Sequence, residues 1–259
     1  MTDAKYTIAP LPSWNSPPKD LKLASNEIHV WRVLLTQTAS CLQSLEQPLS
    51  SDERTKAERF YFQKDRSQFI VSRGALRAIL SRYLDIDPSA LCFGYNPYGK
   101  PFLSAEQGGN ELFFNLSHSR GIALIAVTKN RNIGIDIESI RTDFPCQEIA
   151  ERFFSLLENT VLRSLPLNLQ HKAFFTCWTR KEAYIKAVGK GLFIPLDSFD
   201  VTLAPGEPAA LLNFLENPQE VFRWRLIELI SDSDMVATLA VEGDGNKLLC
   251  WEWQCSSRT

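Results

Sequence analysis

Residues 132–139, NIGIDIES, constrain the fold more than any other stretch of this chain. Isoleucine alternates with glycine or an acid, and successive side chains of a strand point to opposite faces, so the pattern predicts a strand with one apolar and one acidic face. Asp136 and Glu138 then share a face, with their Cα atoms about 7 Å apart. Half-exposed strands often show such alternation, so these acids alone do not identify a site.

A helix is predicted over 174–191, with Gly189 and Gly191 as candidate C-caps. At about 100° per residue, four side chains fall on one arc that should face the core: Phe174, Trp178, Ile185 and Val188. Glu182 and Lys186 lie on the flank of this arc, where a surface (i, i+4) ion pair is the simplest interpretation. Lys181 falls inside the arc and must therefore snorkel, find a partner or face a cleft.

The strand and the helix together supply three carboxylates, Asp136, Glu138 and Glu182, on two rigid elements. Such a set of hard oxygen ligands suits Mg²⁺, which usually takes one or two carboxylates together with substrate phosphates and water. A magnesium site of this kind predicts a substrate that contains phosphate.

Phosphate needs cations, hydroxyls or backbone donors around it. Lys100 lies in the turn GYNPYGKP, where Gly99 leaves the backbone open to a ligand and Pro101 follows. Ser117 and His118 lie at the predicted end of a strand, and the absence of a second histidine at zinc spacing argues against a His-bound metal. The basic stretch 53–66 adds Lys56, although most of its charges should only solvate a helix face.

Composition narrows the class of protein. A net charge of −2 gives no general attraction to nucleic acid or acidic lipid. The six cysteines show no CxxC pair and no zinc spacing, which predicts reduced thiols in a cytoplasmic protein. The N-terminus lacks a signal pattern, and the longest apolar runs are far shorter than the 18 or so residues of a membrane helix.

The order of predicted elements indicates an α+β protein built from two similar halves. The first half has a strand over 27–35, a helical pattern over about 52–83 and two strands within 112–129. The second half follows the acidic strand with helices across about 146–188. Its later strands are expected near 198–203, 221–230, 235–241 and 247–254.

Four motifs in this order, YGKP, NLSHS, IGIDIE and WTRKEAYIKAVGKG, resemble those of the Sfp-type 4′-phosphopantetheinyl transferases. The likeness runs from about residue 50 to 203. It implies two α/β subdomains in a pseudo-two-fold arrangement, with coenzyme A and Mg²⁺ in the cleft between them. We expect an N-terminal subdomain over 1–130, on the side of the coenzyme A 3′-phosphate, and a C-terminal subdomain over 131–259 that holds the magnesium acids.

The resemblance also implies roles for individual residues. Asp136, Glu138 and Glu182 match magnesium ligands, and Glu182 is also a candidate general base. Lys186 matches a lysine that contacts the pyrophosphate. The residues that would grip coenzyme A are Lys56, Gly99, Lys100, Pro101, Ser117, His118 and Lys186.

The implied reaction moves 4′-phosphopantetheine from coenzyme A to a serine of an apo acyl or peptidyl carrier protein and releases adenosine 3′,5′-bisphosphate. The carrier would belong to fatty acid, polyketide or nonribosomal peptide synthesis, and the sequence does not indicate which. Two alternatives stay open, a Mg²⁺-dependent pyrophosphatase acting on coenzyme A-like nucleotides and a non-catalytic module that binds coenzyme A or a carrier protein. One chain would complete the cleft, so a monomer is expected.

Overall fold

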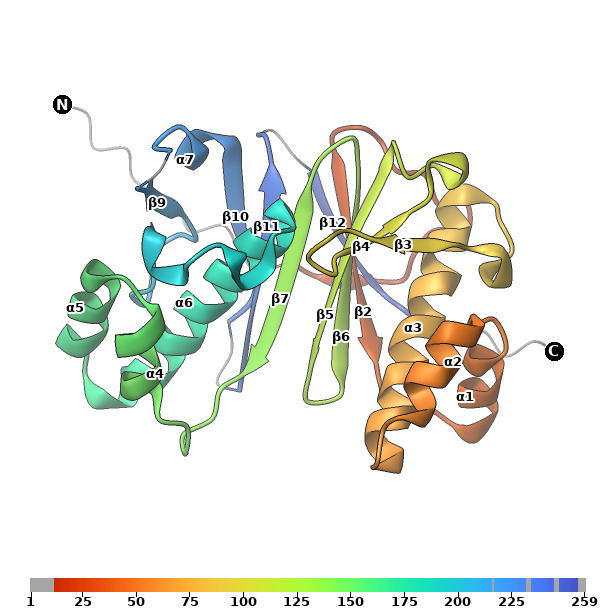
Figure 1. The fold of residues 1–259 in the computed structure, drawn as a ribbon, viewed down its shortest axis with the longest axis horizontal. Helices are drawn as coiled ribbons and strands as arrows, with labels where there is room; N and C mark the ends of the chain where they lie inside the picture. Colours follow the sequence, from red (N-terminus) through yellow and green to blue (C-terminus); the bar gives the residue numbers. More distant parts are fainter. Residues whose placement is uncertain (1–11, 216, 232–233, 245–246, 256–259) are drawn as a thin grey trace.

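The computed structural model describes residues 12–215, 217–231, 234–244 and 247–255. Helices and sheets are mixed along the chain, so the predicted α+β class is confirmed. Figure 1 shows two sheets at the centre of the molecule, with α1 to α3 along one side and α4 to α6 along the other. No described helix is both long enough and apolar enough to cross a membrane.

The larger sheet has five strands in the order β1-β12-β2-β6-β5. Strands β2, β6 and β5 are antiparallel neighbours, whereas β12 runs parallel to β2. The turn between β5 and β6 has positive φ at Arg120 (42°) and Gly121 (81°), as a type I′ hairpin requires. The strands are β1 (Trp14–Asn15), β2 (Glu27–Leu34), β5 (Leu112–Ser119), β6 (Ile122–Lys129) and β12 (Lys247–Glu252).

The smaller sheet has three antiparallel strands in the order β10-β11-β7. Two short hairpins, β3 with β4 and β8 with β9, complete the strand pairings of the described chain. The strands are β7 (Ile133–Ser139), β10 (Trp224–Ser231), β11 (Met235–Glu242), β3 (Phe93–Tyr95), β4 (Pro101–Leu103), β8 (Phe199–Val201) and β9 (Leu211–Phe214).

Seven α-helices lie within the described residues. The two long ones, α3 and α6, pack on the sheets, and the others surround them (Figure 1). The helices are α1 (Ala39–Glu46), α2 (Ser51–Glu58), α3 (Gln63–Leu84), α4 (Cys146–Phe153), α5 (Leu156–Ser164), α6 (Leu167–Val188) and α7 (Glu220–Arg223).

The core has three parts, and one of them lies between the two sheets. Ile133, Ile135 and Ile137 of β7 are buried in this part with apolar side chains of β2, β6 and β11. The predicted apolar face of the strand is therefore confirmed, and its other face is directed at α6. The remaining two parts of the core surround α6 on one side of the molecule and α3 on the other.

The helical pattern predicted over about 52–83 forms two helices rather than one, with a break at residues 59–62. The break lets α2 fold back onto α3, so that buried Glu53 pairs with Arg73 at 2.8 Å and with Arg77 at 2.7 Å. The periodicity alone could not show this reversal, because the partners of Glu53 lie 20 and 24 residues further along the chain.

The last strand crosses between the halves of the sequence. β12 belongs by sequence to the half expected over 131–259, yet it lies between β1 and β2 in the five-stranded sheet. The division at residue 130 stays a prediction, and the C-terminal part of the chain completes the sheet built mainly by the N-terminal part.

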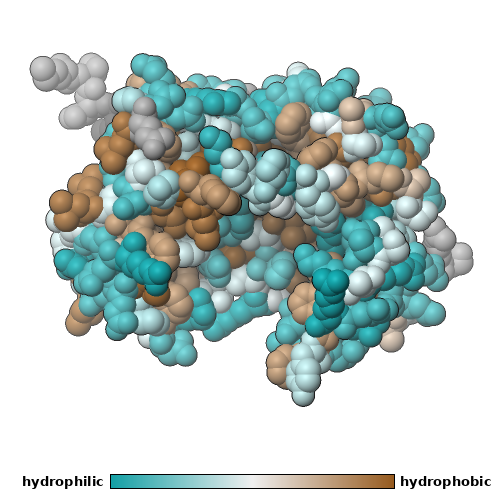
Figure 2. Space-filling view, viewed as in Figure 1, coloured by the Kyte–Doolittle hydropathy of each residue, from teal (hydrophilic) through white to brown (hydrophobic). Residues whose placement is uncertain are grey.

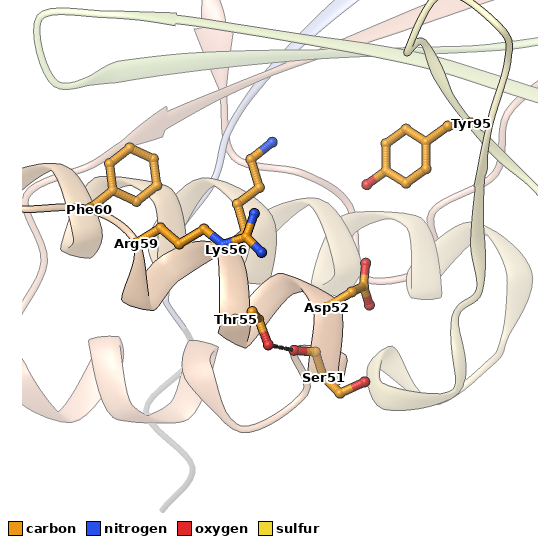
Figure 3. A pocket seen from close by; sticks show the side chains of 7 residues that line it. All are labelled: Ser51, Asp52, Thr55, Lys56, Arg59, Phe60 and Tyr95. Carbon is orange, nitrogen blue, oxygen red and sulfur yellow. Dashed lines mark hydrogen bonds between the residues drawn. The ribbon is translucent and has the colours of Figure 1, made fainter.

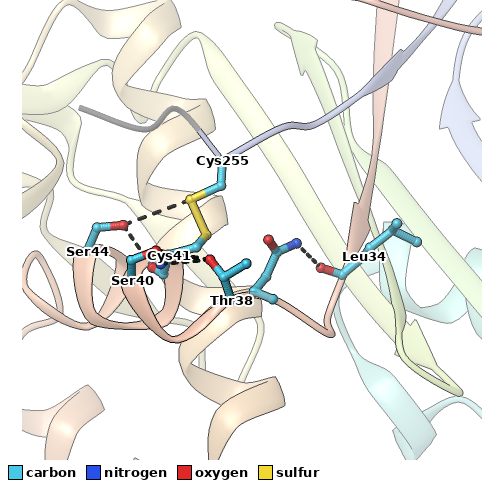
Figure 4. The surroundings of a disulfide bond; sticks show 7 residues. Leu34, Thr38, Ser40, Cys41, Ser44 and Cys255 are labelled. Carbon is cyan, nitrogen blue, oxygen red and sulfur yellow. Dashed lines mark hydrogen bonds between the residues drawn. A yellow bond between two sulfur atoms is a disulfide. The ribbon is translucent and has the colours of Figure 1, made fainter. Parts of the chain in front are cut away.

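The prediction that all cysteines are reduced is wrong. Cys41 of α1 and Cys255, just beyond β12, form a disulfide with their Cα atoms 6.1 Å apart (Figure 4). They are separated by 214 residues in the sequence, so only the folded chain brings them together. The free thiols are Cys92, Cys146, Cys177 and Cys250.

Candidate active site

The acidic strand β7 and the helix α6 approach each other at Gly134. A Cβ atom at this position would lie 2.1 Å from the carbonyl oxygen of Ala183 and 2.3 Å from the backbone nitrogen of Ala187. Only glycine fits here, because real Cβ atoms do not approach backbone atoms so closely. Glycine therefore brings the polar face of β7 directly against the part of α6 that contains Glu182 and Lys186.

Asp136 is at the centre of this contact. Its side chain is buried, and its Oδ1 accepts hydrogen bonds from Lys186 Nζ at 2.5 Å and from Ser117 Oγ at 2.8 Å. Lys186 Nζ also donates to Ser117 Oγ at 3.3 Å. Two residues, Lys186 of α6 and Ser117 of β5, thus converge on one carboxylate oxygen of β7.

The second oxygen of Asp136, Oδ2, is buried and has no hydrogen-bond partner. A buried carboxylate oxygen without a partner is costly, because burial removes its water without replacing it. This oxygen is thus open to a cation or a donor that a ligand would bring.

Glu138 and Glu182 lie in the electric field of the same aspartate. Burial raises the pKa of Glu138, and the negative charge of Asp136 raises it further. Burial also raises the pKa of Glu182, where the charge of Lys186 lowers it and that of Asp136 raises it again. The three predicted acids are therefore close enough for the charge of Asp136 to act on both glutamates.

A divalent cation would offset the negative charge of the three acids, but the protein side chains alone do not supply a complete set of metal ligands. Within the described ranges, no group of three His, Cys, Asp or Glu side chains is arranged to hold a metal ion. The donor set nevertheless fits Mg²⁺ when phosphate and water supply the remaining ligands. The unpartnered Oδ2 of Asp136 is the observation that favours such an ion here.

The NLSHS strand supplies further groups to the site. Ser117 binds Asp136 as described above, and the neighbouring His118 is exposed. Burial of its ring lowers the pKa of His118, and the positive charge of Lys186 lowers it further. The effect of the Lys186 charge on this pKa indicates that His118 lies near Lys186.

Lys100, in the turn between β3 and β4, contacts another part of α6. Its Nζ donates to the carbonyl oxygens of Ile133 and Ala187, each at 3.0 Å, and burial lowers its pKa to about 8. The lysine thus ties the turn between β3 and β4 to the start of β7 and to the C-terminal end of α6. Gly99 and Pro101 flank it; Gly99 is exposed, and a Cβ there would meet nothing within 4 Å.

Lys56 lines a separate pocket of about 880 Å³ between α2 and the end of β3. Figure 3 shows its side chain extending from α2 into the space between Phe60 and Tyr95, with Arg59 beside it. The pocket lining includes none of the three acids.

In the space-filling view the surface is notched at its lower edge, between the part that contains α4 and α6 and the part that contains α2 and α3 (Figure 2).

Lys181, which the helix pattern places inside the apolar arc, finds a partner. Its Nζ is fully buried, lies 2.8 Å from Glu158 Oε1 and donates to the carbonyls of Leu196 and Phe199. The buried pair joins α5, α6 and the segment before β8. Lys181 therefore fixes α6 in place and does not reach the acid cluster.

The sequence reasoning missed two polar residues beside the acids, Asn115 and Ser119. Asn115 Oδ1 accepts from the backbone N–H of Ile135 at 2.9 Å, and Ser119 Oγ accepts from that of Ser139 at 3.1 Å. A signal was present, because Asn115, Ser117 and Ser119 recur at every second position and so share one face or edge of the strand.

Two known families match successive parts of the chain. Residues 31–130 match the family described as "4′-phosphopantetheinyl transferase, N-terminal". Residues 132–240, which contain β7, α6 and β11, match the 4′-phosphopantetheinyl transferase superfamily.

Individual relatives agree with these matches. The 4′-phosphopantetheinyl transferase HetI of Nostoc sp. is 43% identical over 241 residues, which cover 93% of this chain and 98% of the relative. The 4′-phosphopantetheinyl transferase Sfp of Bacillus subtilis is 37% identical over 155 residues, covering 60% of this chain and 66% of the relative. The transferase gsp of Aneurinibacillus migulanus is 36% identical over 156 residues, covering 60% and 62%.

Proposed function

Because the chain belongs to the Sfp-type 4′-phosphopantetheinyl transferases, we propose that it transfers 4′-phosphopantetheine from coenzyme A to a serine of an apo carrier protein. The family membership confirms the resemblance of the four sequence motifs. The observation that supports the activity most strongly is the match to HetI over 93% of the chain, which includes every residue of the acid cluster.

The proposed reaction is a substitution at phosphorus. The serine hydroxyl of the carrier attacks the β-phosphorus of the coenzyme A pyrophosphate, and the bond from that phosphorus to the bridging oxygen breaks. Phosphopantetheine becomes bound to the serine as a phosphodiester, adenosine 3′,5′-bisphosphate leaves, and the serine proton passes to a base.

Glu182 is the candidate for that base. Burial raises its pKa above the ordinary value for a glutamate, and a base is most effective when its pKa approaches the working pH. It would take the proton directly or through one water molecule.

Asp136, Glu138 and Glu182 are the residues that would hold Mg²⁺. When bound, the ion would supply Lewis-acid stabilisation to the pyrophosphate oxygens. The buried and unpartnered Oδ2 of Asp136 supports this assignment, as do the raised pKa values of both glutamates.

Lys186 would add positive charge beside the reacting phosphates. Its ammonium is held by Asp136 and Ser117, so it does not need to reorganise when negative charge develops on the leaving group. Preorganised charge of this kind is often a large part of enzymatic rate enhancement.

The other contacts to coenzyme A are assigned by their chemistry. His118 and Ser117 would donate hydrogen bonds to phosphate next to Lys186, and Lys56 would do so from the pocket that it lines. For Lys100 the same role requires that its ammonium exchange two backbone carbonyls for phosphate oxygens. Gly99 and Pro101 would shape the turn that approaches the nucleotide.

One experiment tests the activity directly. The protein is incubated with coenzyme A, Mg²⁺ and a panel of apo carrier proteins, and each carrier is analysed by mass spectrometry. We expect one phosphopantetheine group on one serine and an equal amount of adenosine 3′,5′-bisphosphate.

The same assay separates the two alternatives. Bisphosphate release without any carrier would indicate the Mg²⁺-dependent pyrophosphatase, and binding of coenzyme A without turnover would indicate a binding module. The matches to named transferases favour transfer over both. We further propose that the protein acts as a monomer in the cytoplasm.

A further inference from the structure

The edges of the two sheets meet at β5 and β7. These strands belong to different sheets, yet side chains of β5 bind the backbone of β7. Asn115 binds Ile135 and Ser119 binds Ser139, and each pair is separated by 20 residues in the sequence. The contacts advance together along both strands, so β5 and β7 run parallel here.

The backbone amides of Ile135 and Ser139, which bind side chains of β5, lie on either side of the two acids. Ile135 directly precedes Asp136, and Ser139 directly follows Glu138, so the segment that contains both carboxylates is held at each end. Between these two backbone contacts, Ser117 binds Asp136 at 2.8 Å, and Ser119 Oγ also lies 3.5 Å from Glu138 Oε2. Side chains at alternate positions of β5 thus replace the backbone hydrogen bonds of a continuous sheet.

From this geometry we propose that Asn115 and Ser119 are positioning residues that hold β7 in register beside β5. Through β7 they fix the places of Asp136 and Glu138 relative to α6. Neither residue needs to touch substrate for this role, and the effect on catalysis rests on the proposed transferase function.

The burial of Asn115 supports a fixed register. Its side chain is only 5% exposed, and the amide of Ile135 that it accepts from is buried as well. Loss of Asn115 Oδ1 would leave the buried N–H of Ile135 without a hydrogen-bond partner. A folded chain avoids this cost by shifting or opening the segment. Since the acidic face of β7 is packed at Gly134 against α6, such a shift would move the acids relative to Lys186.

The test compares Asn115→Ala and Ser119→Ala with two controls. Ser119→Thr keeps the hydroxyl and should behave like wild type. Thr128→Val removes a buried hydroxyl on β6 that donates to the Glu27 carbonyl at 3.3 Å and accepts from Arg131 at 3.3 Å, and both of these partners lie outside β7. It reports what the loss of a buried polar contact does by itself.

Two quantities are measured for each variant. Steady-state kinetics with coenzyme A and an apo carrier should show kcat lowered by about 10- to 100-fold in both alanine variants, with KM for coenzyme A nearly unchanged. Hydrogen exchange of the peptide spanning 133–139 should become about tenfold faster, while α3 keeps its protection.

The proposal is overturned if the alanine variants keep wild-type kcat and wild-type exchange in β7, or if Thr128→Val loses kcat to the same extent. Should Asn115→Ala fail to fold, Ser119→Ala, at a less buried position, decides the outcome. A wild-type protein without transferase activity would refute the proposed function, whereas the exchange measurement would still decide the register.

Discussion

The ammonium of Lys186 lies 2.5 Å from Oδ1 of Asp136, and this ion pair joins α6 to the middle of β7. The other oxygen of the same carboxylate is buried and unpartnered. One side of Asp136 is therefore satisfied by the protein, and the other is available to a ligand. The expected effects of removing the acids and of adding Mg²⁺ depend on this difference between the two oxygens.

Removal of either central acid should abolish transfer. We expect Asp136→Ala and Glu182→Ala to lower kcat/KM by at least about 100-fold, because each removes a proposed Mg²⁺ ligand and Glu182→Ala also removes the candidate base. The thermal midpoint should stay close to that of wild type. Asp143→Ala, at an exposed position beyond β7, is the control, and near-normal turnover in the Asp136 or Glu182 variant would contradict the assignment.

Mg²⁺ should stabilise the folded protein in the presence of coenzyme A. A ligand that binds only the native state raises the unfolding midpoint according to its concentration. The shift, measured by differential scanning fluorimetry with and without a chelator, should be present in wild type and lost in Asp136→Asn. An equal shift in both proteins would place the ion elsewhere.

Lys100 should make stability depend on alkaline pH. Burial lowers its pKa from 10.5 to about 8, so between these values the unfolded chain binds a proton that the native chain has released. Stability therefore rises with pH across this window. In urea unfolding from about pH 7 to pH 10, the free energy of unfolding of wild type minus that of Lys100→Met should increase. Lys190→Met, at an exposed position, is the matched control.

Gly134→Ala should separate β7 from α6. The added methyl would lie 2.1 Å from a backbone oxygen that cannot move without displacing the helix, so we expect a loss of about 1–3 kcal/mol or more in unfolding free energy. Activity should fall together with stability. Gly206→Ala is the control, since a Cβ there meets nothing within 4 Å, although its positive φ will cost a little. A Gly134→Ala protein as stable as this control would disprove the close approach.

The Cys41–Cys255 disulfide should be detectable by counting thiols. Denatured protein should show four reactive thiols before reduction and six after it. Cys255→Ser should lower the free energy of unfolding by about 2–5 kcal/mol under oxidising conditions, and reduction of wild type should have the same effect. Cys92→Ser, which removes an exposed free thiol, serves as the control. Six thiols in the unreduced protein would show that the bond does not form.

The elements of the candidate site were predictable because their signals are local. The alternation in β7 and the apolar arc of α6 each depend on residues a few positions apart. β7 formed where it was expected, whereas α6 begins at Leu167, seven residues before the predicted start at 174. Gly189 ends α6 with a φ of 81°, as a C-cap glycine should.

What the sequence did not show depends on distant partners. The two acceptors of Lys100 are 33 and 87 residues away, and the disulfide closes a separation of 214 residues. Asn115 and Ser119 likewise act on amides in another sheet. A pattern read along one element contains no information about which edge of a second sheet will lie beside it.

The position of β12 determines how this chain can be divided. A fragment that stops at residue 130 would lack the strand that runs between β1 and β2, and would expose one edge of β2 to solvent or to other chains. The two halves are therefore poor candidates for separate expression.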